Sequence, residues 1–190
     1  MTRPEGAPAG AAEARRRGRI KLALLGAFFA VPFAASWLVW NFDLVPGTMG
    51  NYGTLLAPKP VPLPDHPALK GKWVLVTFGG GACDALCERQ LYFVRQVRRA
   101  QGREVNRVAR LWLVTDGATP RAEVLAAIDG AVIAPANGRV DFPPGDGGAV
   151  AAHVFLVDPL GNLMMRFPRD PDPARVIKDL QRLLRASGFG

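Results

Sequence analysis

The two cysteines of this chain stand close together, in the stretch GGGACDALCERQL at residues 79–91. Cys83 and Cys87 follow an apolar stretch directly and open an expected helix. Side chains four residues apart on a helix share one face, and the partial positive charge of a helix N-terminus stabilises thiolates. Thiolates are nucleophiles and soft metal ligands, and the spacing also permits a disulfide. The pair is therefore a redox pair, part of a metal site, or an inert buried pair.

The residues around the pair narrow these alternatives. A bridge between Cys83 and Cys87 would close a very short loop, so it would stabilise the fold little, and we expect the pair to serve chemistry. Asp84 and Glu88 each follow a cysteine and place negative charge where it opposes thiolate formation. A Cys-x-x-Cys motif is absent, and Gly79, Gly80 and Gly81 lack the Lys-Ser/Thr of a phosphate loop.

The elements that position the pair follow from apolar patterning and capping residues. Two short apolar runs predict buried strands, and a third segment predicts a hairpin around Asp-Pro-Leu-Gly-Asn. Thr119 followed by Pro120, and Asp172 followed by Pro173, each predict a helix start. The order is strand, helix, strand, helix, hairpin, helix, which predicts an α/β, thioredoxin-like domain: a central mixed sheet with helices on both faces. The predicted ranges are strands 73–78 and 108–115, a helix from the cysteines onward, helix 119–128, a loop over 130–149, hairpin 153–167 and a helix over 172–188.

A metal site would need a third ligand besides two thiolates, and the chain has two histidines. His66 lies in a proline-rich stretch, where an exposed polar role is expected. His153 begins the third predicted strand, which in a thioredoxin-like sheet runs antiparallel to the first. Its start should therefore lie beside the end of the first strand, near Cys83 and Cys87. Two thiolates and one imidazole favour Cu(I) first and zinc second.

The N-terminal part predicts a membrane anchor. Residues 22–40 form 19 uncharged residues, long enough to span a bilayer as a helix, with Trp37 and Trp40 at the far end. The basic residues of the 1–21 tail should stay in the cytoplasm, which places the rest outside. A cleaved signal peptide is the alternative, but its apolar core is usually shorter. Residues 41–70 are proline-rich and predict a spacer, followed by the domain at residues 71–190.

The basic composition does not indicate nucleic-acid binding. Residues 1–21 carry six Arg or Lys against Glu5 and Glu13, which is half of the net charge of +8. The remainder is spread along the chain without a dense patch interleaved with aromatic residues.

Three motifs in this order resemble the SCO/SenC family, whose members help to assemble copper into cytochrome c oxidase. They are GKWVLVTFGGGACDALC, LVTDGATP and HVFLVDPLGNLMMRF, and the resemblance covers about residues 69–185. It implies that Cys83, Cys87 and His153 are copper ligands and that oxidase subunit II, or another copper-site assembly protein, is the partner. The chain departs from the family pattern at Asp84 and Glu88, where prolines are usual, and at Ala152, where an acidic residue is common.

Together these observations predict a single-pass protein of a bacterial inner membrane with a periplasmic C-terminal domain. The expected function is that of a copper metallochaperone rather than an enzyme with turnover. The alternatives are a thiol–disulfide oxidoreductase that keeps partner cysteines reduced through Cys83 and Cys87, and a degenerate assembly factor without metal.

Overall fold

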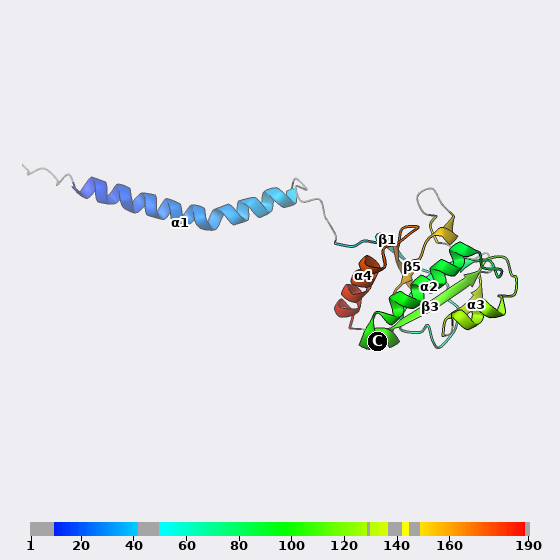
Figure 1. The fold of residues 1–190 in the computed structure, drawn as a ribbon. Helices are drawn as coiled ribbons and strands as arrows, with labels where there is room; N and C mark the ends of the chain where they lie inside the picture. The colour runs from blue at the N-terminus through cyan, green and yellow to red at the C-terminus, as the bar shows by residue number, and fades with distance from the viewer. Residues whose placement is uncertain (1–9, 42–49, 129, 137–141, 145–148, 189–190) are drawn as a thin grey trace, which may run out of the picture. The chain divides into compact units, whose positions relative to one another are not determined.

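The computed structural model describes residues 10–41, 50–128, 130–136, 142–144 and 149–188. The chain divides into two compact units, Met1–Met49 and Gly50–Gly190. In the first unit, α1 (Gly10–Asn41) is a single helix with Pro32 inside it (Figure 1). Its segment Arg15–Val39 is long and apolar enough to cross a membrane, which makes it a candidate span.

The second unit is built on one mixed sheet of six strands in the order β1-β6-β5-β2-β3-β4. β2 pairs parallel with β3, and β3 parallel with β4, whereas β5 runs antiparallel to both β2 and β6. Every residue of β2 and β3 is buried, which explains their continuous apolar sequences. The strands are β1 (Thr54–Pro60), β2 (Trp73–Gly79), β3 (Val108–Val114), β4 (Val132–Pro135), β5 (Phe155–Val157) and β6 (Asn162–Arg166).

Three helices pack on one face of this sheet. α2 (Ala85–Arg99) and α4 (Pro173–Ala186) bury their apolar stripes against Leu75 and Leu156, and α3 (Ala122–Ala127) packs against Trp112 (Figure 1). Two 3-10 turns, η1 (Gly102–Arg107) and η2 (Val150–Ala152), lead into β3 and β5.

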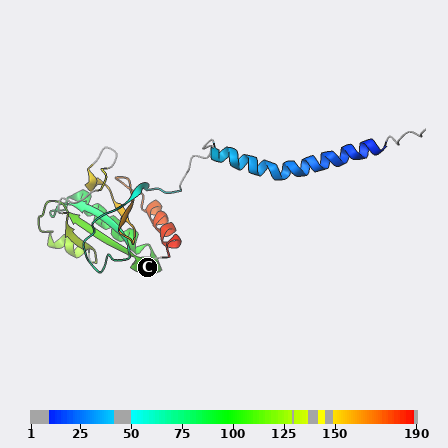
Figure 2. The same ribbon diagram turned by 180° about the vertical axis from the view of Figure 1, so that it is seen from behind.

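The opposite face has a different cover. Phe78 and Phe155 pack there against Val61, Leu69 and Phe142, all of which lie outside helices. Figure 2 shows the fold from behind. In the described residues, the cover on this side consists of segments between strands and of the 3-10 turn η2, which packs there through Val150 and Ala151. The thioredoxin-like arrangement itself, a mixed sheet flanked by helices, is confirmed.

The predicted elements are confirmed where local signals were strong. β2, β3, the β5–β6 hairpin and α4 fall where expected, and Asp172 caps α4 by accepting from the Ala174 backbone N–H at 2.8 Å. The predicted start of α3 is wrong: the helix begins at Ala122, and Arg121 rather than Thr119 is its N-cap residue. The predicted loop 130–149 contains β4, while residues 137–141 and 145–148 of that prediction lie outside the described residues.

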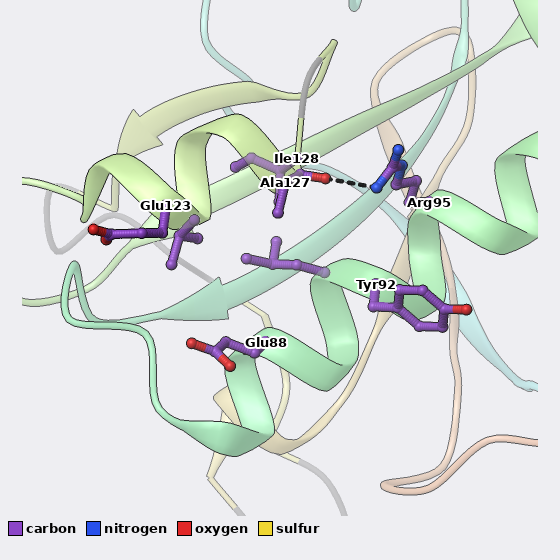
Figure 3. Close-up of a pocket in the computed structure, with 8 residues that line it drawn as sticks. Glu88, Tyr92, Arg95, Glu123, Ala127 and Ile128 are labelled. Atoms are coloured by element: carbon purple, nitrogen blue, oxygen red, sulfur yellow. Dashed lines mark hydrogen bonds between the residues drawn. The ribbon is translucent and has the colours of Figure 1, made fainter.

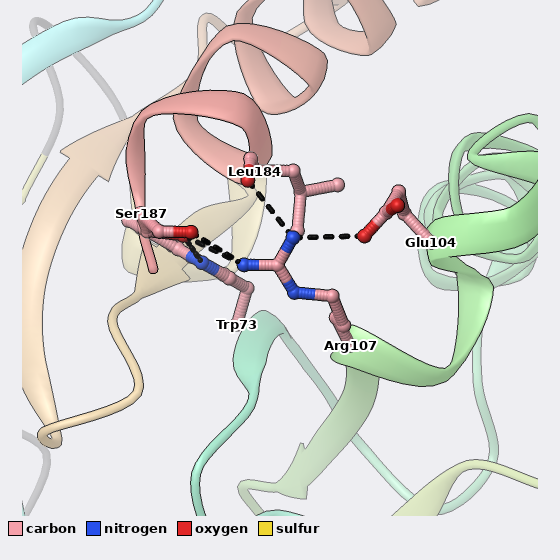
Figure 4. Close-up of polar contacts among 5 residues, drawn as sticks. All are labelled: Trp73, Glu104, Arg107, Leu184 and Ser187. Atoms are coloured by element: carbon pink, nitrogen blue, oxygen red, sulfur yellow. Dashed lines mark hydrogen bonds and ion pairs between the residues drawn. The ribbon is translucent and has the colours of Figure 1, made fainter. Parts of the chain in front are cut away.

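The C-terminal end of α4 is tied to the start of β3 by one arginine. Arg107 donates to the Leu184 carbonyl at 2.9 Å and to the Ser187 carbonyl at 2.8 Å, and it pairs with Glu104. Trp73, at the start of β2, donates to the Ser187 hydroxyl at 3.2 Å (Figure 4). These contacts hold α4 against the end of the sheet that lies farthest from the cysteines.

Candidate functional site

Cys83 and Cys87 form a disulfide at the end of β2, with their Cα atoms 5.2 Å apart. The predicted placement of both cysteines on the helix is wrong, because α2 begins at Ala85 with Asp84 as its N-cap. Only Cys87 lies in the first turn of α2, while Cys83 precedes the cap.

The backbone of Cys83 is in the left-handed region, with φ of 46°. A side chain other than glycine rarely adopts this conformation, and such residues cluster at functional sites. Here it is stabilised by a turn in which the Cys83 N–H donates to the Gly80 carbonyl at 2.9 Å. The turn carries the chain from the end of β2 into the cap of α2.

The two acidic residues beside the cysteines are both engaged. The Asp84 carboxylate accepts a hydrogen bond from the Cys87 N–H at 2.9 Å, which is an N-cap contact. Glu88 pairs with Arg121, and Arg121 also donates to the Cys83 carbonyl at 2.9 Å. The sequence suggested that these two negative charges would oppose thiolate formation. In the structure, the charge of Glu88 is compensated by Arg121, and the carboxylate of Asp84 caps α2.

The three glycines before the pair are required by close packing. A methyl group on Gly79 would lie 2.7 Å from Cys87 Sγ, and one on Gly80 would lie 2.5 Å from Asp116 Oδ2. On Gly81 it would lie 2.4 Å from the Ala118 carbonyl oxygen. These distances are too short for a side-chain carbon. The loop of Gly79, Gly80 and Gly81 can therefore pack this closely only because its residues have no side chains.

Asp116 fastens this glycine loop to the segment after β3. Its carboxylate accepts from the Gly81 N–H at 2.9 Å and from the Ala118 N–H at 3.0 Å. The bond from Gly81, followed by that from Ala118, lowers the pKa of Asp116 below its ordinary value.

The disulfide is buried, with 2% of Cys83 and 4% of Cys87 exposed. It packs with Leu91, Trp112 and Val114, and it is covered by Val124 of α3 and by Ile128, the C-cap residue of that helix. The pair is therefore buried, as the alternative of an inert pair would have it, but the disulfide and the left-handed Cys83 set it apart from ordinary core residues.

A groove of about 280 Å³ lies beside the disulfide between α2 and α3. Glu88, Tyr92 and Arg95 line it from α2, and Glu123, Ala127 and Ile128 from the α3 side (Figure 3). Arg95 crosses it to donate to the Ala127 carbonyl at 3.0 Å. Leu91, Val124 and Ile128 belong both to the lining of this groove and to the cluster that buries the disulfide.

His153 lies where the fold argument placed it along the sheet. β5 runs antiparallel to β2 with Phe155 opposite Val76, so the residues before Phe155 run alongside the end of β2. The imidazole is buried, and Nδ1 lies 2.9 Å from the Phe167 carbonyl oxygen. Because a carbonyl only accepts, Nδ1 carries the proton and Nε2 is left as the possible ligand atom.

The three predicted ligands do not form a metal site in this arrangement. Both sulfurs are bonded to each other. Among the residues that the structure describes, no group of three or more His, Cys, Asp or Glu side chains is placed to hold a metal ion. His66 is exposed and its Nδ1 accepts from the Ala68 N–H at 3.1 Å, in keeping with the polar role expected for it.

Sequence reasoning missed Arg121, Asp116 and Trp112 as neighbours of the pair. Asp116 could have been found, because β2 and β3 are parallel and residues that follow their ends meet at one edge of the sheet. Arg121 and Trp112 carry no local signal, since each reaches the pair only through the folding of α3 and β3 against α2.

Comparisons with known proteins agree with this fold. A search among curated proteins found no match. Similar solved structures include copper-bound ScoI of Bradyrhizobium japonicum, 24% identical, with 60% of this chain and 86% of that chain covered and a TM-score of 0.46. Copper-bound yeast Sco1 is 15% identical, with 72% and 90% covered and a TM-score of 0.46. A SCO1/SenC family lipoprotein of Bacillus anthracis is 17% identical, with 70% and 94% covered and a TM-score of 0.46.

Sco proteins are thus among the solved structures that resemble this chain, as the sequence motifs predicted. A family model described as "Transmembrane-like, thioredoxin-like, C-terminal domain" matches residues 73–187. This match spans more than half of the chain, so the protein belongs to the transmembrane-like, thioredoxin-like C-terminal domain family.

Proposed function

We propose that the protein is a membrane-anchored thiol–disulfide protein that exchanges electrons with partner cysteines through Cys83 and Cys87. The observation that carries this proposal is the disulfide itself, placed at the start of α2 with Cys83 in a left-handed conformation. A structural bridge would gain little from so short a loop. The pair therefore has the position and the bonding state of a redox couple.

The exchange needs only the two sulfurs and a partner disulfide. In the reduced chain, the Cys83 thiolate attacks one sulfur of the partner, whose S–S bond breaks and whose second sulfur leaves with the electron pair. The Cys87 thiolate then attacks Cys83 Sγ in the mixed disulfide and releases the other partner sulfur. Two electrons pass to the partner, and the chain returns to the disulfide form seen here.

The resemblance of three sequence motifs to SCO/SenC proteins supports a partner in copper-site assembly, such as oxidase subunit II. α1 supports anchoring in the inner membrane with the domain in the periplasm. There the chain would keep the partner's copper-site cysteines reduced.

Equilibration with glutathione tests the redox proposal. The full chain in detergent is incubated in glutathione buffers of known poise, and free thiols are trapped with maleimide and counted by mass. We expect one two-electron transition between no free thiol and two, and no transition in Cys83→Ser. A pair that stays oxidised in all buffers that reduce an ordinary exchangeable disulfide would overturn the proposal.

Copper binding by Cys83, Cys87 and His153 is a second proposal, favoured by two observations on His153. The antiparallel pairing of β5 with β2 supports its place at the cysteine end of the sheet. Its Nδ1 contact with Phe167 resembles the carbonyl contact that commonly orients a ligating histidine. Thiolate and imidazole donors suit copper, with zinc as the less favoured metal. Binding would need prior reduction of the disulfide and an approach of His153.

His153→Ala separates the two proposals, with His66→Ala as a matched control. If His153 is a ligand, its loss should weaken Cu(II) binding strongly and Cu(I) binding less, because two thiolates hold Cu(I) alone. The sulfur-to-copper absorption band of the Cu(II) form should disappear or shift, and the glutathione equilibrium should stay the same. Unchanged Cu(II) spectra and affinity in His153→Ala would exclude the ligand role.

A further inference from the structure

Trp112, in the middle of β3, has a buried indole N–H without an acceptor. The side chain is fully buried, and Nε1 has no hydrogen-bond partner among the described residues. A buried donor left unpaired costs free energy, and native proteins rarely tolerate it without a compensating role. The unpaired N–H therefore needs an explanation.

The indole nitrogen of Trp112 and the sulfur of Cys87 both lie close to Gly79. A methyl group on Gly79 would be 2.7 Å from Cys87 Sγ and 3.3 Å from Trp112 Nε1, so the sulfur and the nitrogen border the same small space at the end of β2. Trp112, Cys83 and Cys87 also belong to one buried cluster. A neutral sulfur is a weak hydrogen-bond acceptor, whereas an ionised acceptor forms a stronger bond.

We propose that Trp112 donates a hydrogen bond from its indole N–H to Cys87 Sγ when the disulfide opens, and thereby stabilises the reduced pair. This proposal rests on the redox function proposed above. It makes Trp112 a residue that sets the reduction potential of the pair.

The chemical step shows where the donor acts. The thiolate of a reducing thiol such as glutathione attacks Cys83 Sγ and forms a new S–S bond. The Cys83–Cys87 bond breaks, and its electron pair leaves on Cys87 Sγ as a thiolate. In this proposal Cys87 is the leaving sulfur, since it lies in the first turn of α2 and borders Gly79 with Trp112, whereas Cys83 precedes the helix. Both sulfurs are buried, so the attack requires Val124 and Ile128 to move away from the pair. The new negative charge then appears beside the unpaired N–H.

Trp73, the tryptophan of β2, offers a matched control. Trp73 is also buried, but its Nε1 already donates to the Ser187 hydroxyl at 3.2 Å, at the opposite end of the strand (Figure 4). Trp73→Phe and Trp112→Phe therefore remove the same atoms from the same sheet. Only Trp112→Phe removes a donor that faces a sulfur.

The test measures the thiol–disulfide equilibrium of the full chain with glutathione in wild type and both variants. Loss of a donor to the thiolate should destabilise the reduced form, so Trp112→Phe should be harder to reduce. We expect its equilibrium constant for reduction to fall about tenfold, or about 30 mV toward a more negative potential for this two-electron couple. Trp73→Phe should keep the wild-type constant.

A second measurement does not depend on the folding of a variant. In ¹⁵N-labelled full chain in detergent, reduction by a phosphine should move the indole N–H resonance of Trp112 downfield and leave that of Trp73 in place. An unmoved Trp112 resonance would overturn the proposal, as would an equal change of the constant in both variants or no change in Trp112→Phe. A wild-type pair that does not equilibrate with glutathione would overturn the redox function instead, and the phosphine-reduced spectrum would still decide the role of Trp112.

Discussion

Cys83 and Cys87 are bonded to each other, yet their surroundings make them unequal. The Cys87 N–H donates to Asp84 within the first turn of α2, which fixes this residue in the helix. Cys83 lies before the cap with φ of 46°, and its carbonyl accepts from Arg121. Both sulfurs are buried, so a partner can attack only after the cover over the pair opens, and we expect the attacked sulfur to be that of Cys83, which lies outside the helix.

We expect Arg121 to limit access to Cys83, because it ties the segment before α3 to both Cys83 and Glu88. The ion pair of Arg121 with Glu88 is half exposed, so it stabilises the closed position of this segment little. The hydrogen bond to the Cys83 carbonyl stabilises that position by about 1 kcal/mol. We expect Arg121→Ala to speed alkylation of reduced Cys83 by iodoacetamide about three- to tenfold.

Arg95→Ala is the control for Arg121→Ala, because Arg95 also joins α2 to α3, at the Ala127 carbonyl. It should leave the alkylation rate of Cys83 nearly unchanged. Equal rates in Arg121→Ala and wild type would show that Arg121 does not limit access to the sulfur.

Titration of Asp116 should make the stability of the folded chain depend on pH in the acid range. Its pKa is lowered in the folded chain by the Gly81 N–H and then by the Ala118 N–H. A carboxyl whose pKa is lower in the folded state stabilises the fold above its ordinary value of 3.8 and loses that effect as the pH falls through the lowered pKa. Asp116→Asn keeps an acceptor oxygen but removes this titration. We therefore expect the Tm difference between wild type and variant to shrink as the pH falls from 7 to 2.

The control for this profile is Asp170→Asn, at an exposed aspartate in the segment before α4. This variant removes one carboxylate without touching the Gly81 loop, so it reports the pH effect of losing a carboxylate by itself. A pH profile of Asp116→Asn no different from that of Asp170→Asn would contradict the role assigned to the two backbone contacts.

At the scale of elements, β1 changes the predicted domain boundary. The proline-rich residues 41–70 were expected to form a spacer, but residues 54–60 pair antiparallel with β6 at the edge of the sheet. An edge strand needs its backbone N–H groups on one side only, so it tolerates Pro58 and Pro60. The spacer prediction is wrong for this segment, while residues 42–49 lie outside the described residues.

Asp179 on α4 holds the chain that enters β1. Its buried carboxylate accepts from the Tyr52 N–H at 2.7 Å and from the Gly53 N–H at 3.0 Å. Asp179→Ala would leave these donors without an acceptor, so we expect the free energy of unfolding to fall by roughly 2–3 kcal/mol. Urea unfolding of the full chain measures this change.

Lys178→Ala, at the exposed neighbouring position, should change the free energy of unfolding by much less. Asp179→Asn keeps an oxygen acceptor and should be intermediate. A loss in Asp179→Ala no larger than that in Lys178→Ala would mean that α4 does not hold β1.

At the scale of the whole molecule, the orientation of the chain should follow the charges beside α1. We expect the basic residues before the apolar stretch to stay in the cytoplasm, so the domain should lie outside. A phosphatase that is active only outside the cytoplasm, fused after Gly190, should be active, and the fusion should stay with membranes after carbonate washing.

Replacing the basic residues at positions 15–21 with glutamine provides the control, because loss of this charge should reduce phosphatase activity. Activity of a cytoplasmic reporter in the unmodified chain, or release of the mature domain as a soluble protein, would contradict the anchored topology.

The sequence alone determined the features that depend on neighbours along the chain. The continuous apolar runs of β2 and β3 mark strands that are buried on both faces, and Asp172 with Pro173 marks the start of α4. The turn around Gly161 marks the β5–β6 hairpin. Each signal lies within a few residues of the structure that it predicts, so local physical chemistry is enough to read it.

The tertiary structure alone decided the contacts that join distant segments. β1 is a strand only because β6 lies beside it, and the cover over the disulfide exists only because α3 packs on α2. In the sequence, Trp112 is indistinguishable from any other core residue of a buried strand. In the structure, its indole and Cys87 Sγ border the same space because Gly79 has no side chain. Such proximity depends on packing between elements rather than on spacing in the chain, which is why no local pattern could reveal it.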